Sequence, residues 1–594
     1  MKDLKGAAKF YAHYLSPFKW IMAVVILLTI VATYLQVNAP IYMGQAITNL
    51  TNYLQEWMNP ATRAGANLNA FHSALLMMVL FYVGYAISMF ASTLLISQVS
   101  GRGAGNMRTG LFGKMQKMRI NYFDSHSDGD MLSLYTSDLD NIFNAMNQAL
   151  FEIFSSVALF IGMIWIMFTR DATLAWVTIA STPVAIILAA VVILKAQKNV
   201  NAQQDAVGKL NGYVNEQIAG QKVIITNGLQ KDSIAKFTNY NDNEVRPKSF
   251  QGQFWSSVLY PLMNGFALLN TALVTFVGSW LVLSGNMSVA SGLGLVVVFV
   301  QYASQYYQPI ITMTSLYNMI QLAITGARRI NEVLEQPDEV RPQNGKTFNG
   351  VNDNVKIDDV HFSYVEGKEV LHGITIEAKR GEMVALVGPT GSGKTTVMNL
   401  MNRFYDVDSG AITIDGVDIR EMDLENLRQN VGIVLQDPQL FSGTIADNIK
   451  FGKPDATHEE VVDAAKQANI HDFIEGLENG YETKISDDNS VFSAGQKQLI
   501  SIARTIITNP KILILDEATS NVDTVTEAKI QAAMDNVIEG RTSFVIAHRL
   551  KTILNAHKIS VLRNGNIIEL GSHEELLKEN GFYSELYHNQ MVFE

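Results

Sequence analysis

Apolar runs of membrane length dominate the first part of the chain. Six such runs lie within roughly the first 320 residues, and each is long enough to cross a bilayer as a helix. A helix of 20 residues spans about 30 Å, because each residue adds about 1.5 Å along the axis. The predicted spans are residues 20–39, 71–97, 149–168, 173–194, 254–283 and 290–311. The first run is too long for the core of a cleaved signal peptide, so it is predicted to span as well.

Beyond the last run the pattern becomes that of a soluble protein, in which short apolar strands alternate with amphipathic helices. The mean hydropathy of +0.11 is therefore an average over two environments. A chain of 594 residues is also longer than one core usually organises. We expect an α-helical transmembrane domain over residues 1–325, a linker over 326–350 and an α/β domain over 351–594.

Lysine and arginine are unevenly shared among the connections between the predicted spans. The leader and the two long loops carry many of them, whereas the three short connections carry only Arg63 and Arg170. Positively charged loops remain in the cytoplasm. We therefore expect both termini and the soluble domain on the cytoplasmic side, with the lipid bilayer as a partner of the helical domain.

The two long cytoplasmic loops, of about 50 and 60 residues, have helix-forming sequences, so the membrane helices are expected to continue well beyond the bilayer. The chain is predicted to turn back at Ser137 to Asp140 and at Thr226 to Leu229. These turns are candidates for elements that couple the two domains. Ordinary solvated loops are the alternative.

Composition removes several classes of function. The formal net charge is −11, and the sequence has no basic stripe of the kind that binds phosphate backbones, so no nucleic-acid partner is expected. The chain has no cysteine. Disulfides, thiolate metal sites and cysteine nucleophiles are thereby excluded.

The clearest chemical motif follows the apolar strand predicted at residues 383–387. It fits the pattern G-x-x-x-x-G-K-[ST], in which glycines let backbone N–H groups surround phosphates at the start of a helix. Lys394 is expected to reach the β- and γ-phosphates, and Thr395 to hold Mg²⁺. ATP and Mg²⁺ are the predicted ligands. The motif and the residue after it are Gly388, Pro389, Thr390, Gly391, Ser392, Gly393, Lys394, Thr395 and Thr396.

A second apolar strand, at residues 512–515, ends in the acidic pair Asp516 and Glu517. A magnesium-nucleotide site needs a carboxylate near the metal and a base near the attacking water. Asp516 is predicted to anchor Mg²⁺ through water, and Glu517 to orient or deprotonate the lytic water. A structural acidic pair that caps a strand is the alternative.

The sequence Phe492-Ser493-Ala494-Gly495-Gln496, located 20 residues before Asp516, resembles the L-S-G-G-Q signature of ABC transporters. The resemblance extends over the whole chain, because six spans before an ABC-type P-loop ATPase domain is the order of ABC exporter half-transporters. It implies a dimer in which the signature of one subunit closes on ATP bound to the other. It also implies roles for further residues: Tyr364 stacks on adenine, Gln436 forms the Q-loop and contacts Mg²⁺, Asp523 forms the D-loop, His548 senses the γ-phosphate, and Ser493, Gly495 and Gln496 contact nucleotide.

The signature departs from the family pattern at Phe492 and Ala494, and the preceding segment, Asp487 to Val491, lacks the family's arginine. Altered signature residues beside intact Lys394, Glu517 and His548 resemble one subunit of the heterodimeric bacterial multidrug exporters. The implied partner is a second half-transporter with a conventional signature and a weakened base. Drift within a homodimer is the alternative.

Substrate contacts are expected in the membrane domain. Tyr302, Gln305 and Tyr306 form an amphipathic set in the last span, and Glu152 is the only acid in its span. Such residues suit planar or cationic amphipathic molecules. Interfacial aromatic residues and a snorkelling carboxylate are the alternatives. The resemblance implies ATP-driven export across a bacterial plasma membrane; a lipid or lipopeptide flippase, an importer and a non-transporting ATPase are the other classes considered.

Overall fold

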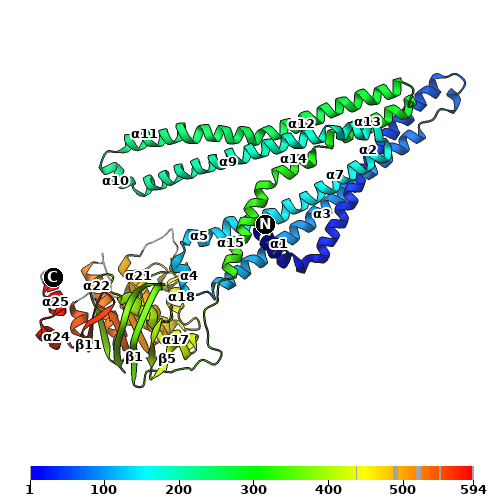
Figure 1. The fold of residues 1–594 in the computed structure, drawn as a ribbon. Helices are drawn as coiled ribbons and strands as arrows, with labels where there is room; N and C mark the ends of the chain where they lie inside the picture. The colour runs from blue at the N-terminus through cyan, green and yellow to red at the C-terminus, as the bar shows by residue number, and fades with distance from the viewer. Residues whose placement is uncertain (1, 437, 486–491, 517–522, 548–549, 592–594) are drawn as a thin grey trace. The chain divides into compact units, whose positions relative to one another are not determined.

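A computed structural model describes the chain apart from residues 1, 437, 486–491, 517–522, 548–549 and 592–594 (Figure 1). The chain forms two compact units. A helical unit comprises Met1–Gln116 and Ser127–Gln336, and an α/β unit comprises Lys117–His126 and Pro337–Glu594. The short segment Lys117–His126 thus belongs to the first long loop in sequence but to the α/β unit in space.

The helical unit contains long helices joined by short turns (Figure 1). In chain order its elements are α1 (Lys2–Leu15), η1 (Ser16–Phe18), α2 (Lys19–Met58), η2 (Arg63–Gly65), α3 (Asn69–Met115), α5 (Asp128–Ser133), η3 (Leu134–Asp138), α6 (Leu139–Asn144), η4 (Ala145–Ala149), α7 (Leu150–Arg170), α8 (Ala172–Ala180), α9 (Thr182–Ala219), α10 (Gln221–Thr226), α11 (Gln230–Tyr240), η5 (Asn241–Val245), α12 (Arg246–Leu283), α13 (Val289–Gln305), α14 (Gln308–Ser315) and α15 (Tyr317–Leu334).

The prediction of six spans is confirmed. Within the described residues, six helical stretches are long and apolar enough to cross a membrane. They are Lys9–Met58, Asn69–Met115, Asp128–Arg170, Ala172–Ala219, Gln230–Leu283 and Val289–Met313. The helix α3 has 47 residues. Since about 20 residues cross a bilayer, such a helix also extends well beyond it, as predicted.

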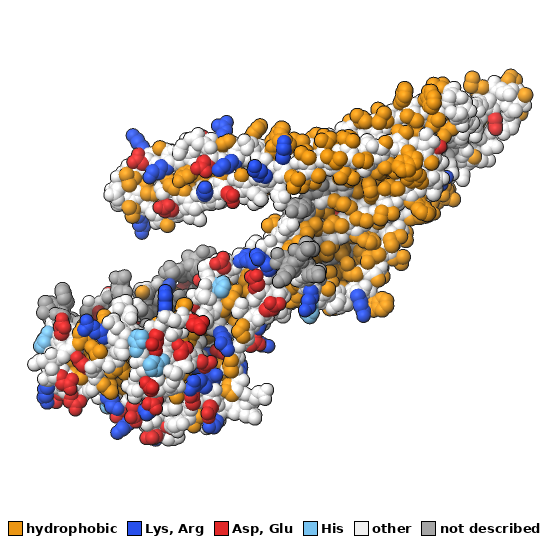
Figure 2. All heavy atoms as spheres, in the orientation of Figure 1, with side chains coloured by type: hydrophobic (Ala, Val, Ile, Leu, Met, Phe, Trp, Pro, Cys, Tyr) orange, Lys and Arg blue, Asp and Glu red, His pale blue; other side chains and the backbone are white. Residues whose placement is uncertain are grey.

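Apolar and charged side chains occupy different parts of the helical unit. Figure 2 shows apolar side chains covering the middle of the long helices, whereas charged side chains gather around α10 and α11. The first and last spans approach closely: a β-carbon on Gly44 of α2 would lie 2.6 Å from the carbonyl oxygen of Gly294 of α13. Small residues allow such close approach between membrane helices.

The two predicted turns have different outcomes. The turn at Thr226 to Leu229 is confirmed, because α10 ends at Thr226, α11 begins at Gln230 and Gly228 between them has a φ of +68°. The turn at Ser137 to Asp140 is wrong, because this stretch lies inside the helical run from η3 into α6. Asp138 is buried there and forms an ion pair of 2.6 Å with Arg329 of α15.

The α/β unit contains a mixed sheet and an antiparallel sheet. The first has the strand order β12-β11-β3-β10-β9-β6, in which only β12 is antiparallel to its neighbour, and the second has the order β2-β1-β4-β5. The strands are β1 (Asn354–Val365), β2 (Lys368–Lys379), β3 (Met383–Val387), β4 (Ser409–Ile414), β5 (Val417–Asp418), β6 (Val431–Val434), β7 (Gly443–Thr444), β8 (Lys484–Ile485), β9 (Ile512–Asp516), β10 (Thr542–Ile546), β11 (Lys558–Arg563) and β12 (Asn566–Gly571).

The helices of the α/β unit include α4 from the first long loop. In chain order they are α4 (Ile120–Ser125), α16 (Lys394–Met401), η6 (Ile419–Glu421), α17 (Leu424–Asn430), α18 (Ile445–Lys450), α19 (His458–Gln467), α20 (His471–Glu475), η7 (Gly480–Glu482), α21 (Ala494–Thr508), α22 (Thr524–Ile538), α23 (Leu550–Leu554), α24 (His573–Glu579) and α25 (Phe582–Met591). One face of the mixed sheet packs against α21 and α22, and the other face packs against α16 and the antiparallel sheet. The strand β3 is buried along its whole length, as expected for a central parallel strand.

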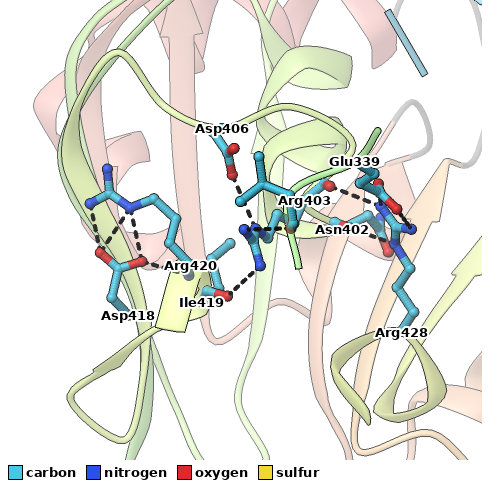
Figure 3. A network of polar contacts seen from close by, with 9 residues as sticks. Glu339, Asn402, Arg403, Asp406, Asp418, Ile419, Arg420 and Arg428 are labelled. Carbon is cyan, nitrogen blue, oxygen red and sulfur yellow. Dashed lines mark hydrogen bonds and ion pairs between the residues drawn. The ribbon is translucent and has the colours of Figure 1, made fainter. Parts of the chain in front are cut away.

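Two arginines attach the segment after α15 to the α/β unit (Figure 3). Arg428 binds Glu339 through two hydrogen bonds of 2.6 and 3.1 Å. The buried Arg403 donates to the carbonyl oxygen of Val340 at 3.3 Å and to Asp406 at 3.0 Å. The second half of the predicted linker is therefore a fixed part of the α/β unit, whereas its first residues belong to α15.

Candidate functional site

The loop between β3 and α16 requires glycine at defined positions. Gly388, Gly391 and Gly393 have φ angles of +154°, +82° and +105°, a region that other residues rarely adopt. A β-carbon on Gly388 would also collide with the carbonyl oxygen of Leu562. The loop leads into the first turn of α16, where free N–H groups favour an anion. The local sequence thus builds a phosphate cradle.

Ser392 and Lys394 give this cradle its polar groups. The hydroxyl of Ser392 is buried and has no hydrogen-bond partner among the described atoms of the protein, so it is suited to a ligand oxygen. Lys394 is 7% exposed, and its Nζ donates to the carbonyl oxygens of Gly388 at 2.7 Å and Pro389 at 3.0 Å. Burial lowers the pKa of Lys394, while the charge of Asp516 acts in the opposite direction. These groups fit a phosphate anion.

Three parallel strands bring residues that are far apart in sequence to one sheet edge. Gly388 follows β3, Asp516 ends β9, and Gln436 lies two residues after β6. Ligands of open α/β sheets bind at the carboxyl ends of the strands, which is where these three residues lie. Gln436 and Thr395 are exposed.

Tyr364 is tied to the helix that follows the phosphate loop. Its hydroxyl donates to Oγ1 of Thr396 at 3.3 Å and accepts from Nδ2 of Asn399 at 3.2 Å. Its ring is half exposed and meets the ring of Tyr405 edge to face, with centroids 5.0 Å apart. An aromatic face therefore lies beside the phosphate loop, as base stacking requires.

The signature segment forms the start of α21. The hydroxyl of Ser493 accepts from the N–H of Gln496 at 3.3 Å, and Oε1 of Gln496 accepts from the N–H of Ser493 at 2.9 Å. This reciprocal pair is a capping box. Ala494 is exposed at the first helical position, whereas Phe492 is buried against Phe473 with ring centroids 6.2 Å apart. Both departures from the family signature are thus accommodated without backbone strain.

Asp523 is the N-cap of α22, which begins at Thr524. Its carboxylate accepts from the N–H of Thr526 at 3.0 Å, and this bond lowers the pKa of Asp523. Glu517, His548 and the altered segment from Asp487 to Val491 lie outside the described residues. Their roles remain predictions from the sequence.

The candidate substrate residues have two kinds of environment. Tyr302 and Tyr306 are 2% and 1% exposed, and their hydroxyls contact the carbonyl oxygen of Val37 at 2.7 Å and Oγ1 of Thr182 at 3.1 Å. They act as packing residues in this conformation. Gln305 and Glu152 are half-buried.

Sequence reasoning missed two residues around Tyr364. Asn399 contacts its hydroxyl and Tyr405 contacts its ring, and Tyr405 in turn donates a hydrogen bond to Asp124 of α4. The adjacent Phe404-Tyr405 pair after the α16 helix, which is partly buried, was an available signal, since aromatic residues beside a ligand loop often have a binding role.

A phosphate-loop ATPase unit joined to a six-span helical unit defines a membrane-bound, nucleotide-driven protein. Comparisons with known families give the same result: residues 22–310 match the family described as the ABC transporter transmembrane region, and residues 371–520 match the family described as ABC transporter. The chain belongs to the ABC transporter family. It is an ABC-type ATPase whose hydrolysis of ATP is coupled to transport, with membrane and ATPase regions in the half-transporter arrangement of exporters.

Several bacterial relatives cover nearly the whole chain. YfiC of Bacillus subtilis, named as an uncharacterized ABC transporter ATP-binding protein, is 36% identical over 99% of this chain and 95% of its own. A protein of Mycobacterium tuberculosis named as a fatty acid ABC transporter ATP-binding/permease protein is 35% identical over 89% of this chain and 83% of its own. YgaD of Bacillus subtilis, whose name assigns it to multidrug export, is 32% identical over 98% of this chain and 99% of its own.

Proposed function

We propose that this chain is one half of a heterodimeric exporter of amphipathic molecules, with one catalytic and one degenerate ATP site. The observation that carries the proposal is the combination of an intact phosphate loop and acidic pair with a signature altered at Phe492 and Ala494. In this arrangement the chain's own nucleotide site is completed by the partner's conventional signature. The altered signature closes on the partner's nucleotide instead.

The proposed chemistry uses residues at the edge of the mixed sheet. Lys394 and the loop N–H groups bind the phosphates, and Tyr364 stacks on the base. Thr395, Gln436 and Asp516 would hold Mg²⁺, which neutralises charge that develops on the phosphates. Glu517 orients and deprotonates the attacking water, and His548 contacts the γ-phosphate. ATP binding biases the dimer toward closure, and hydrolysis resets it.

The capping box supports a positioning role for the signature. Because Ser493 and Gln496 hold each other, the first turn of α21 is fixed, and we propose that its remaining N–H groups, at Ala494 and Gly495, face an anion bound by the other subunit. Ala494 adds a methyl group at this end, which hinders close approach of a phosphate. A weakened contact with the partner's nucleotide is therefore expected.

The proposed substrates are amphipathic small molecules of the multidrug type. The name of YgaD supports this class. A lipid-like substrate is the second candidate, because the mycobacterial relative is named for fatty acid transport. The bacterial origin of these relatives supports location in a bacterial plasma membrane. The lysine and arginine residues of the leader and the two long loops support a cytoplasmic position for both termini and the ATPase unit.

The test is to purify the full chain alone and together with a half-transporter encoded in the adjacent reading frame, and to compare ATPase rates. The proposal expects weak hydrolysis by the lone chain and strong hydrolysis by the pair. Restoring the signature with Phe492→Leu and Ala494→Gly should leave the turnover of the pair nearly unchanged, because a signature cannot replace a missing base in the partner. Robust hydrolysis by the lone parental chain, raised further by the repaired signature, would identify a homodimer.

A further inference from the structure

Two membrane spans are interrupted at matching places in the helical unit. The fourth span breaks between α8, which ends at Ala180, and α9, which begins at Thr182. The last span breaks between α13, which ends at Gln305, and α14, which begins at Gln308. A proline follows each break at the second position of the new helix, Pro183 in one case and Pro309 in the other. Each proline lacks the N–H group that would continue the helical hydrogen bonds.

The two breaks contact each other through side chains. The hydroxyls of Ser181 and Tyr307 are 2.6 Å apart, and Oγ1 of Thr182 donates to the hydroxyl of Tyr306 at 3.1 Å. Tyr306 and Tyr307 are the two residues that separate α13 from α14, so each break supplies the partner of the other. Both tyrosines are fully buried. The broken ends therefore meet in a dry, tightly packed environment.

A third helix contributes to the same place. Asn270 of α12 is 0% exposed, and its Nδ2 donates to the carbonyl oxygen of Thr178, in the last turn of α8, at 3.0 Å. Oδ1 of Asn270 has no partner among the described atoms. A carbonyl freed by a helix break is costly in hydrocarbon, and a neighbouring side chain commonly satisfies it. Asn270 satisfies the carbonyl oxygen of Thr178 in this way, and its Oδ1 remains available to accept a further hydrogen bond.

We propose that these residues form a polar joint at which the fourth and last spans bend together during transport. The joint consists of Ser181, Thr182, Asn270, Tyr306 and Tyr307. A regular helix resists bending because every backbone hydrogen bond must be preserved, but a span already broken at a proline bends at low cost. The contacts between the two breaks hold the joint in the conformation described here. Loss of these contacts is then the step that allows bending.

The proposal rests on the transport function, and it assigns positioning roles rather than substrate contact to Tyr306 and Tyr307. It also explains why Tyr306 and Tyr307 are buried. Tyr302 provides a matched control, because it is equally buried in the same packing cluster but its hydroxyl bonds to Val37 of α2, away from both breaks.

The test measures bending of the fourth span directly. Because the sequence contains no cysteine, spin labels can be placed at Trp176→Cys on α8 and Leu194→Cys on α9, two exposed positions on either side of the break. The distance between the labels is measured in the full-length transporter in lipid nanodiscs, with and without Mg-ATP. The parent should show one main distance without nucleotide and a second population with Mg-ATP.

Removing the two tyrosine hydroxyls while keeping their rings should favour the bent form. In Tyr306→Phe with Tyr307→Phe, the ratio of bent to straight populations without nucleotide should rise at least about fivefold, because each buried hydrogen bond contributes about 0.5–1.5 kcal/mol. Tyr302→Phe should leave the ratio at the parental value. If the double variant does not assemble, Tyr307→Phe alone should shift the ratio at least about twofold.

Two results would overturn the joint: a parental distance that does not respond to Mg-ATP, or phenylalanine variants at 306 and 307 that match both the parent and Tyr302→Phe. The measurement needs no transported substrate, and it is made in the assembled dimer, whether the second subunit is another half-transporter or a second copy of this chain. Failure of the joint is therefore distinguishable from failure of the proposed heterodimer.

Discussion

The hydroxyl of Tyr405 donates a hydrogen bond to the carboxylate of Asp124. Tyr405 follows the helix of the phosphate loop, and Asp124 lies on α4 in the long loop between the second and third spans. The ring of Tyr405 also contacts the ring of Tyr364, which is predicted to stack on adenine. The segment Lys117–His126 is also attached through a hydrogen bond of 2.7 Å from the N–H of Glu339 to the carbonyl oxygen of Lys117. A continuous set of contacts therefore joins Tyr364, the residue predicted to stack on adenine, to a loop that connects two membrane spans.

We expect Tyr405→Phe in the assembled transporter to retain ATP binding and to lower the amount of substrate transported per ATP by up to about tenfold, because one hydrogen bond of about 0.5–1.5 kcal/mol is lost. The phenylalanine ring keeps the contact with Tyr364. Tyr481→Phe is the control, since its hydroxyl contacts His471 at 2.8 Å, away from the loop. Equal coupling ratios in Tyr405→Phe, Tyr481→Phe and the parent would contradict a role for this contact.

Close packing of the first and last spans gives a second prediction. Gly294→Val should lower thermal stability and folded yield, because its side chain would meet the backbone of Gly44, and overpacking costs about 1–3 kcal/mol. Gly101→Ala on α3 serves as the control, since a β-carbon there meets nothing within 4 Å. The measurement is a thermal unfolding curve of the purified protein. A parental melting temperature for Gly294→Val would show that the two helices do not depend on this contact.

The phosphate loop gives a third prediction. Lys394→Ala should weaken Mg-ATP binding at least about tenfold, because charge-assisted hydrogen bonds to a phosphate contribute about 1.5–3 kcal/mol. Lys379→Ala is the control, an exposed lysine on β2 of the same unit. Titration with a fluorescent nucleotide gives the dissociation constants. Parental affinity in Lys394→Ala would remove this lysine from the nucleotide site.

The sequence was most informative where function and local pattern coincide. The six spans were predictable because membrane length and apolar composition are local properties, and the phosphate loop because glycine, lysine and threonine have fixed spacing next to a strand. The place of Asp516 at the end of an apolar strand was predictable for the same reason. These parts of the fold need no knowledge of distant contacts.

The remaining features depend on partners far away in the sequence. The polar stretch Ser137 to Asp140 predicts a turn, yet Asp138 forms an ion pair with Arg329, almost 200 residues later, and the helix continues. The pattern around Tyr306 predicts a substrate contact, whereas its hydroxyl contacts Thr182 in another span. Pro183 and Pro309 were visible signals of the two helix breaks, but their meeting could be seen only in three dimensions.

Glu152 gives a prediction about substrate charge. It lies in the first turn of α7 and is half-buried, so it acts on a nearby cation through a dielectric lower than that of water. Glu152→Gln should weaken transport of cationic dyes about fivefold, equal to about 1 kcal/mol, and leave an uncharged substrate nearly unchanged. Transport assays with the two kinds of substrate separate the effects. Equal losses for both would point to a defect in folding.

The central claim is that this chain carries the hydrolytic site that drives export. The most direct test is ATP-dependent uptake of a cationic dye into inverted membrane vesicles that contain the assembled transporter. Glu517→Gln should still bind Mg-ATP, because the amide keeps the shape of the side chain, but hydrolysis and uptake should both fall at least about a hundredfold since the base is lost. Hydrolysis and uptake at the parental rate in Glu517→Gln would contradict the account.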